Sequence, residues 1–338
     1  VEHDIRMPSI SLASLGLGIY NWSSSAIAEP NWGGTNATLN KTFTKTIYQQ
    51  ALTAGTRYNF SDYWHMILGG RFARVKYDSF NENHKTGARS ANTYITKSKF
   101  SPYAGLTWDF LKDHSWYVSY AEIFKPQSAT DANKNVLEPV VGYNIETGVK
   151  SEFLGGALNT AVALFQIIQE NRAITDPNNS NYSIAEGKVR SRGIDAEISG
   201  SITERWSVMA GYTFNKSEYL KSERKTSSNV DYNKGADAKK YVPRHMFKLY
   251  TSYEIPLVGT QKLSIGTGVR YQSKTSGIYM KDNMSSGSAI SYYVPEQKGY
   301  ALWDANINYL INDNFSVGLI VKNITDKKYF YNTHNRTA

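Results

Sequence analysis

Histidine, cysteine and acidic side chains build most metal sites and hydrolytic centres, and this chain offers few arrangements of that kind. Its six histidines are His3, His65, His84, His114, His245 and His334. None stands three or four residues from another, the H-x-x-H or H-x-x-x-H spacing that lets two rings bind one metal ion. Cysteine is absent, which excludes disulfides, zinc knuckles and thiol nucleophiles. We therefore expect no metal site and no cofactor bound by the chain itself.

His84 and His334 come closest to a hydrolytic arrangement, because they lie in stretches with loop character beside Glu82 and Asn335. A protease or lipase would need such a histidine to meet a carboxylate and a serine at one rim of the fold. The sequence pairs neither histidine with a nucleophile. We expect no enzyme, and a rim enzyme is the weakest alternative considered.

The elements that must position any site are β-strands, and residues 300–330 display their pattern most clearly. Every second residue from Ala301 to Ile311, and again from Phe315 to Val321, is apolar or aromatic, with Asn-Asp-Asn between the two runs. Such alternation puts apolar and polar side chains on opposite faces, and the polar turn indicates a hairpin. About ten residues at ~3.3 Å each and a tilt near 45° rise ~23 Å, which matches the ~25 Å apolar band of an outer-membrane barrel.

Similar runs recur along the whole chain, and the connections between them alternate in length. The strand-like runs are 46–60, 64–78, 98–110, 115–125, 142–154, 157–172, 186–201, 205–218, 242–255, 262–275, 299–311 and 314–323. Short connections fall at 61–63, 111–114, 155–156, 203–204, 256–261 and 312–314, and long polar ones at 79–97, 126–141, 173–185, 219–241, 276–298 and 324–338. Short periplasmic turns alternating with long external loops are typical of outer-membrane barrels, whereas sandwiches and propellers do not sort their loops in this way.

This pattern predicts an all-β protein, a transmembrane antiparallel β-barrel with about 12–13 strands. If the short turns are periplasmic, both ends of a closed twelve-strand barrel would lie outside the cell. Bacterial barrels ordinarily keep their termini in the periplasm, so we expect part of a larger barrel. Tyr271 ends an apolar run and is expected at a membrane interface rather than in a ligand site.

Composition agrees with a barrel and limits the partners. The 338 residues are 13% aromatic with a mean hydropathy of −0.48. No run approaches the ~18 apolar residues of a membrane helix, so a spanning protein must be a closed barrel. The net charge of +9 comes without a Lys/Arg-rich run. We expect a charged lumen and loops near outer-membrane lipid and lipopolysaccharide, and no nucleic acid. The first residues show no signal peptide, which suggests a mature or truncated piece.

Several segments resemble a known family in both order and spacing. They are YVSYAEIFKPQS (117–128), GYNIETGVKSEFLGGALNTAVALFQIIQENRA (142–173), RGIDAEISG (192–200), PRHMFKLYTSYEIP (243–256) and VKNITDKKYF (321–330). Over roughly residues 20–338 the chain is similar to TonB-dependent ferric-siderophore receptors, especially the coprogen, ferrioxamine and pyoverdine group. The resemblance implies a 22-strand barrel whose lumen is filled by a plug. Residues 1–338 are then expected to be a partial barrel domain that lacks the N-terminal plug, the early strands and the final strand.

The resemblance also implies the function of the parent protein: binding a ferric siderophore outside the Gram-negative outer membrane and importing it with energy from the TonB complex, contacted through the absent plug. A siderophore already wraps its iron, so the receptor needs aromatic faces and a few donors rather than metal ligands. The expected binding residues are Trp22, Trp32, Tyr182, Tyr241, Arg270, Tyr279, Tyr292, Tyr293 and Tyr331. Arg190 or Arg192 is a further expected donor on the lumen side. The main alternative is a passive outer-membrane porin.

Overall fold

The computed structural model describes residues 2–6, 38–84, 86–127, 129–133, 135–176, 179–221, 234–276, 280–281, 292–293 and 296–330. The chain divides into two compact units. Unit 1 comprises Val1–Leu52, Phe72–Lys99 and Asn133–Val136, and unit 2 comprises Thr53–Arg71, Phe100–Ala132 and Leu137–Ala338.

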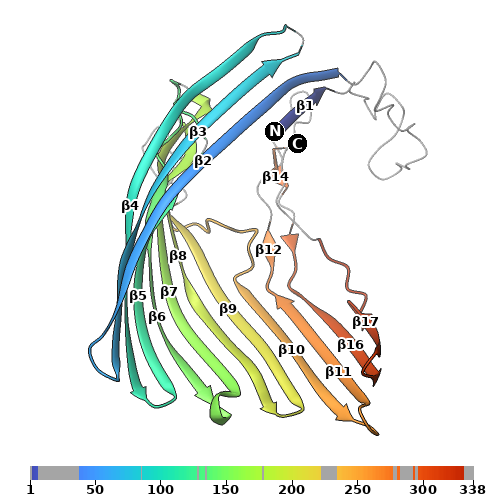
Figure 1. Ribbon diagram of the computed structural model, residues 1–338. Helices are drawn as coiled ribbons and strands as arrows, with labels where there is room; N and C mark the ends of the chain where they lie inside the picture. Colours follow the sequence, from blue (N-terminus) through green and yellow to red (C-terminus); the bar gives the residue numbers. More distant parts are fainter. Residues whose placement is uncertain are drawn as a thin grey trace, which may run out of the picture. The chain divides into compact units, whose positions relative to one another are not determined.

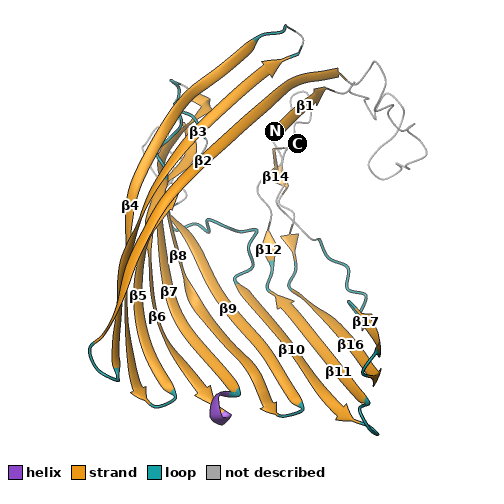
Figure 2. Cartoon of the chain, viewed as in Figure 1, coloured by secondary structure: helices purple, strands orange, loops and turns teal. Residues whose placement is uncertain are grey.

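Strands make up most of the described chain (Figure 2). They are β1 (Glu2–Arg6), β2 (Thr38–Asn59), β3 (Trp64–Asn83), β4 (Arg89–Leu111), β5 (His114–Lys125), β6 (Val140–Phe153), β7 (Leu158–Asp176), β8 (Asn179–Thr203), β9 (Trp206–Lys221), β10 (His245–Pro256), β11 (Lys262–Gln272), β12 (Thr275–Ser276), β13 (Met280–Lys281), β14 (Tyr292–Tyr293), β15 (Glu296–Gln297), β16 (Tyr300–Asn312) and β17 (Phe315–Val321). A single helical turn, Leu154–Gly156, joins β6 to β7. Among the described residues, no helix has the length and apolarity needed to cross a membrane.

The large strands form one 13-stranded sheet in chain order, from β1 through β11 to β16 and β17 (Figure 1). The registers described are antiparallel, as for β5 with β6 and β10 with β11. The all-β antiparallel architecture is therefore confirmed. The strand β1, which the alternation did not reveal, pairs with β2 in unit 1, where Glu2 lies opposite Phe43.

All twelve predicted runs are strands, but two predicted long loops are wrong. The stretch 173–185 continues β7 and β8, whose pairing extends to Asp176 opposite Asn179. The stretch 79–97 is likewise mostly strand, because β3 reaches Asn83 and β4 begins at Arg89. Backbone pairing requires no apolar alternation, so these polar hairpin ends carried no strand signal.

One face of the sheet in unit 2, the apolar face, carries large hydrophobic side chains that are exposed. Cross-strand partners share a face, and Tyr253, Ile265, Ile307 and Leu319 form one such row across four strands. Leu319 is 60% exposed. A contiguous exposed apolar surface of this kind is unusual for a water-soluble monomer and fits contact with lipid.

The same pairing decides the orientation of β7, which the sequence left ambiguous because Leu164 and Phe165 are adjacent. Leu164 lies opposite Ile194 and belongs to the apolar face. Phe165 lies opposite Gly193 and Glu146, on the other face, which we call the polar face.

Aromatic side chains of unit 2 form two belts near the ends of the apolar face. At the short-turn end, ring contacts run from Trp64 to Trp108, Phe110, His114 and Phe153, with centroid distances of 5.5–6.0 Å. At the opposite end, His245 lies 5.0 Å from Phe214 and accepts or donates a hydrogen bond with the Tyr212 hydroxyl. Tyr271 lies opposite Phe247 on the same face. Two such belts are typical of membrane interfaces.

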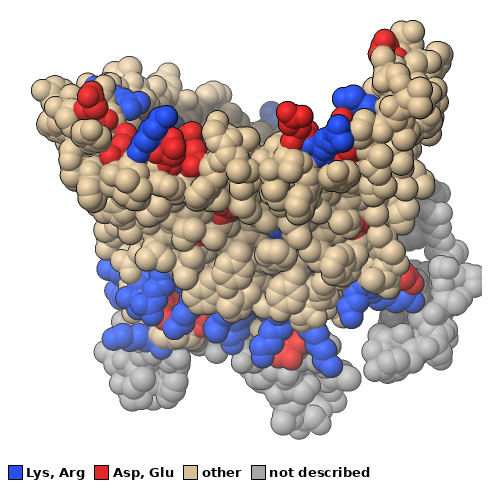
Figure 3. Space-filling view, turned by 90° about the horizontal axis from the view of Figure 1, so that it is seen from below, with Lys and Arg blue, Asp and Glu red and all other residues tan. Residues whose placement is uncertain are grey.

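Charged side chains avoid the region between the belts. Figure 3 shows Lys and Arg gathered along one edge of the face in view, beside a broad area with few charged side chains. A charged side chain beside lipid hydrocarbon is energetically unfavourable, which explains why charged residues lie outside the area between the belts.

Candidate functional site

The polar face of β10, β11 and β16 carries a hollow of about 830 Å³ with charged walls. Arg270, a predicted binding residue, lies in this hollow and donates from Nη2 to Asp304 Oδ2 at 2.9 Å. Its side chain is 53% exposed, so solvent or a ligand reaches it. Asp304 also accepts a hydrogen bond from the Asn323 backbone at 2.8 Å. Arg270 is therefore held in place by a carboxylate that sequence reasoning did not pair with it.

Tyr250 lines the same hollow and was not singled out from the sequence. Its hydroxyl donates to Asn306 Oδ1 at 3.1 Å. A Cβ atom on Gly266 would stand 2.5 Å from the Tyr250 oxygen and 2.4 Å from Asn306 Oδ1. Glycine at this position thus leaves the room that the Tyr250–Asn306 pair occupies.

A second site forms at the long-loop end, where Gln127 holds the connection between β5 and β6 against β7. Its Nε2 donates to the backbone oxygens of Asn171, at 2.7 Å, and Glu138. Its Oε1 accepts from the Ala173 backbone at 3.0 Å. Asn171 has a φ of 59°, and the β7–β8 register shifts at Arg172. Gln127 therefore satisfies backbone groups that this bulge leaves unpaired.

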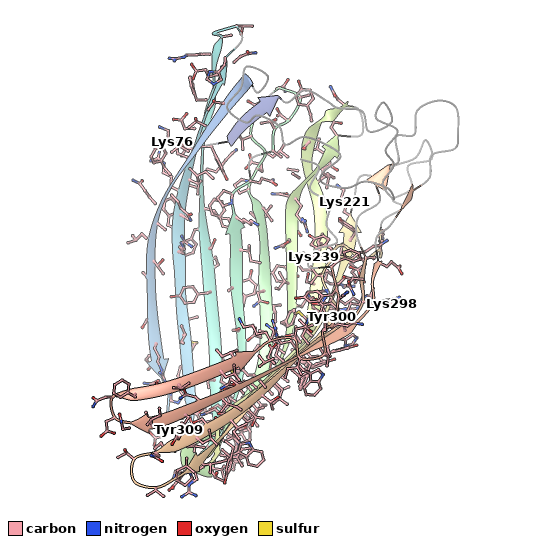
Figure 4. The ribbon with its side chains drawn as sticks, turned by 90° about the vertical axis from the view of Figure 1, so that its right-hand side faces the viewer. Lys76, Lys221, Lys239, Lys298, Tyr300 and Tyr309 are labelled. Carbon is pink, nitrogen blue, oxygen red and sulfur yellow. The ribbon has the colours of Figure 1, made fainter. Side chains whose placement is uncertain are left out.

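The charges of Lys125 and Arg172 act on Lys239, and we call Lys125, Arg172 and Lys239 the cation group. Burial lowers the pKa of Lys239, and the charges of Arg172 and Lys125 lower it further. The Nη1 atom of Arg172 is buried and has no hydrogen-bond partner in the described part of the chain. No carboxylate there pairs with any of the three. Figure 4 shows Lys239 near Lys298 and Tyr300, away from Tyr309 at the short-turn end.

Three like charges that form no side-chain ion pair in the described residues favour an anion, which would supply the missing acceptor and relieve their mutual repulsion. Sequence reasoning missed all three, since they come from separate segments. Its only signal was the KPQ stretch at 125–127, which carried part of the family resemblance.

The predicted aromatic residues are only partly within the described chain. Tyr182 is half-buried in β8, and Tyr241 is half-buried in the segment before β10. Tyr292 and Tyr293 form strand β14, paired with β13. Trp22, Trp32, Tyr279 and Tyr331 lie outside the described residues.

The prediction that Arg190 or Arg192 faces the lumen is wrong for both. Arg192 lies opposite Gln166 and Lys216, and Arg190 lies opposite Ile168 and Glu218. These positions continue the side of β8 that carries Ile194, which is the apolar face. The same alternation that identified the strand would have placed both arginines correctly.

The histidines form no catalytic arrangement in the described chain. His65 Nε2 lies 2.9 Å from Asp109 Oδ2, and the Ser115 hydroxyl donates to the other Asp109 oxygen at 2.5 Å. The carboxylate thus stands between serine and histidine, whereas a hydrolytic triad needs histidine in the middle. His84 bonds to Thr42 at 2.7 Å, and His334 lies outside the described residues. Those residues contain no group of histidines and carboxylates placed to hold a metal ion.

Comparison with known proteins identifies the family to which the chain belongs. Residues 9–324 match the family model described as TonB dependent receptor-like, beta-barrel. The ferric-pyoverdine M114 receptor PbuA of Pseudomonas sp. (strain M114) is 32% identical over 281 residues, covering 81% of this chain and 32% of that protein. The ferrioxamine B receptor of Salmonella typhimurium (strain LT2) is 30% identical over 269 residues, covering 79% of this chain and 35% of that protein.

A solved structure agrees with the sequence relatives. The ferripyoverdine receptor of the outer membrane of Pseudomonas aeruginosa, crystallised with ferripyoverdine, aligns with a TM-score of 0.69 and 30% identity. The alignment covers 91% of this chain and 38% of the receptor. This chain spans about a third of the length of the curated relatives it matches.

Proposed function

Because this chain belongs to the TonB-dependent receptor-like β-barrel family, we propose that its parent protein imports a ferric siderophore across a Gram-negative outer membrane. The observation that carries the proposal is the two-faced sheet, with an exposed apolar face between aromatic belts and a polar face with charged hollows. The matched family is one of receptors rather than enzymes. The similarity to pyoverdine and ferrioxamine receptors supports a siderophore over the general solutes of a porin.

We further propose that residues 1–338 form the later part of the barrel, with the plug, the early strands and the final strand supplied elsewhere in the parent. The relatives are about three times as long as the region they share with this chain, which supports this assignment. The plug would link the barrel to the TonB complex.

The chelate would rest on both polar sites. Arg270 and the aromatic residues Trp22, Trp32, Tyr182, Tyr241, Tyr279, Tyr292, Tyr293 and Tyr331 are the proposed contacts to its body. The cation group, Lys125, Arg172 and Lys239, would attract a chelate that carries negative charge. Charge-assisted hydrogen bonds to chelate oxygens require no metal ligand from the protein.

A growth experiment tests import. A bacterium that makes no siderophore of its own would express the full-length parent and receive ferric pyoverdine or ferrioxamine B as sole iron source. Growth should require both the parent and an intact TonB. Equal growth without TonB would contradict active import, and a steady ion conductance of the purified parent in planar bilayers would favour a porin.

A binding experiment tests the role of the cation group. The parent would be titrated with two ferric hydroxamates that differ by one added carboxylate. Arg172→Gln should weaken binding of the carboxylated chelate by about tenfold or more, the usual effect of losing a hydrogen bond to a charged group. An equal loss for both chelates would argue against charge recognition.

A further inference from the structure

The apolar face carries a charged feature at the end of β8 and β9 away from the short turns. We call Arg190, Arg192, Lys216 and Glu218 the Glu218 cluster. Arg190 lies directly opposite Glu218, and Arg192 lies directly opposite Lys216. Cross-strand partners share a face, so the four side chains form one compact block.

Three cations in this block share one carboxylate. Arg190 donates to Glu218 Oε1 from Nε at 2.9 Å and also from Nη2. Lys216 Nζ lies 3.2 Å from the second oxygen, and Arg192 Nη2 lies 4.0 Å from the first. The Glu218 side chain is 8% exposed, whereas Arg192 is 49% exposed. The acid is therefore covered. Asp237, which lies opposite Glu218 on its other side, pairs with Arg244 at 2.9 Å, so two positive charges of the cluster remain in excess.

Neighbouring cations on the same two strands are balanced differently. Lys188 pairs with Glu170 at 2.6 Å, and Lys221 pairs with Glu186 at 2.8 Å. Each of these lysines has a carboxylate of its own. The surplus charge at Arg192 and Lys216 is thus a local property of the Glu218 cluster and not of this level of the sheet.

The excess positive charge at Arg192 and Lys216 lies directly beside the exposed apolar side chains. Arg192 is followed after two residues, about 7 Å along the strand, by Ile194, which lies opposite Phe214 and Leu164. Leu164 is 53% exposed. A ligand that fits this arrangement has an anionic headgroup beside Arg192 and Lys216 and a hydrocarbon part beside the apolar face. The spacing matches a lipid whose phosphate lies at the membrane interface and whose acyl chains lie along the barrel wall.

We propose that Arg192 and Lys216 bind the phosphate of an outer-leaflet lipid headgroup, with Glu218 and Arg190 as the support that fixes both cations. This rests on the proposed location in the outer membrane, and it concerns the outer wall of the barrel rather than the siderophore path. The phosphate would accept hydrogen bonds from Arg192 and Lys216 and offset the surplus charge. Glu218 orients the cations without neutralising them all.

A matched pair of variants tests the proposal in the full-length parent. Arg192→Gln/Lys216→Gln and Lys188→Gln/Lys221→Gln each remove two positive charges from β8 and β9. Binding of purified parent to lipopolysaccharide vesicles should weaken roughly thirtyfold in the first variant, given the usual effect of each Lys or Arg beside an anionic membrane. The second variant should lose less than a few fold. Equal losses would overturn the proposal.

Two further arms complete the test. Phosphatidylcholine vesicles should bind both variants alike. Inorganic phosphate should compete poorly with lipopolysaccharide for the parent. If phosphate competed as strongly as the lipid, the site would be a simple anion site and the lipid assignment would be overturned. Ferric-chelate binding, measured on the same samples, should stay unchanged, which separates this inference from the proposed import. If the double variant does not assemble, Lys216→Gln alone should still weaken lipid binding several-fold, and no change would count against the proposal.

Discussion

The side-chain amide of Gln127 donates a hydrogen bond to the backbone oxygen of Asn171 at 2.7 Å, joining the segment after β5 to the bulge in β7. Asn171 in turn donates from Nδ2 to the Pro139 oxygen at 3.4 Å. The bulge that contains Arg172 is therefore held by contacts from a segment 44 residues earlier in the chain.

Gln127→Leu should loosen the β7 bulge, because the Ala173 N–H and the Asn171 carbonyl lose their partner. Leaving such groups unpaired costs about 1–3 kcal/mol. Amide hydrogen exchange at Ala173 should accelerate, and the full-length parent should bind an anionic ferric chelate more weakly. Gln261→Leu is the control, because the Gln261 side chain accepts a hydrogen bond from the Tyr309 hydroxyl at the short-turn end. Unchanged exchange at Ala173 would show that Gln127 does not hold the bulge.

Gly193→Ala should destabilise the barrel, whereas Gly211→Ala should not. A Cβ atom at Gly193 would stand 1.9 Å from the Phe214 oxygen and 2.7 Å from the Phe165 ring, but at Gly211 its nearest neighbour is 4.0 Å away. Overpacking of this kind costs about 1–3 kcal/mol. The midpoint of urea unfolding in detergent measures the difference. Equal midpoints for the two variants would mean that Phe165 does not lie over Gly193.

Leu164→Arg and Met209→Arg should distinguish the lipid-facing side of the sheet from the water-facing side. Both side chains are more than half exposed, Leu164 on the apolar face and Met209 on the polar face. Arginine costs ~2–4 kcal/mol near the bilayer midplane and little in a wet lumen. The free energy of folding into lipid bilayers should therefore fall only for Leu164→Arg. A larger loss for Met209→Arg would reverse the assignment of the faces.

Binding of an anionic chelate should weaken as the pH rises, because the pKa of Lys239 lies below that of an ordinary lysine. The side chain holds its proton and attracts the anion at pH values below that lowered pKa, and it loses the proton as the pH passes through it. A titration of chelate affinity against pH measures the decline. Lys239→Met should remove it, and Lys298→Met should keep it. A decline that persists in Lys239→Met would assign the titration to another group.

The strands and their faces were predictable because a half-buried strand must alternate. Ile145 and Val149 in β6 already indicate the apolar face from the sequence, and the pairing with β7 confirms it. The alternation failed where both neighbours are apolar, as at Leu164 and Phe165, and where both partners are polar, as at Thr175 opposite Ser183. In both cases the backbone pairs although the side chains do not alternate between apolar and polar.

The candidate sites were much less predictable. Arg270 was expected to bind, and the structure places it in a charged hollow, but the role stays a prediction. Its partner Asp304 is 34 residues away, a separation with no local pattern. Arg190 and Arg192 were assigned to the wrong face although their spacing from Ile194 carried the correct answer.

By itself the sequence determined that this chain is a set of long two-faced strands with short turns at one end, because the two-residue period of a strand is a local property. Tertiary structure alone decided that the charges of Lys125 and Arg172 act on Lys239, and that three cations share Glu218. These groupings depend on register and on a bulge. Both are set by hydrogen bonds between strands distant in sequence, so no local pattern encodes them.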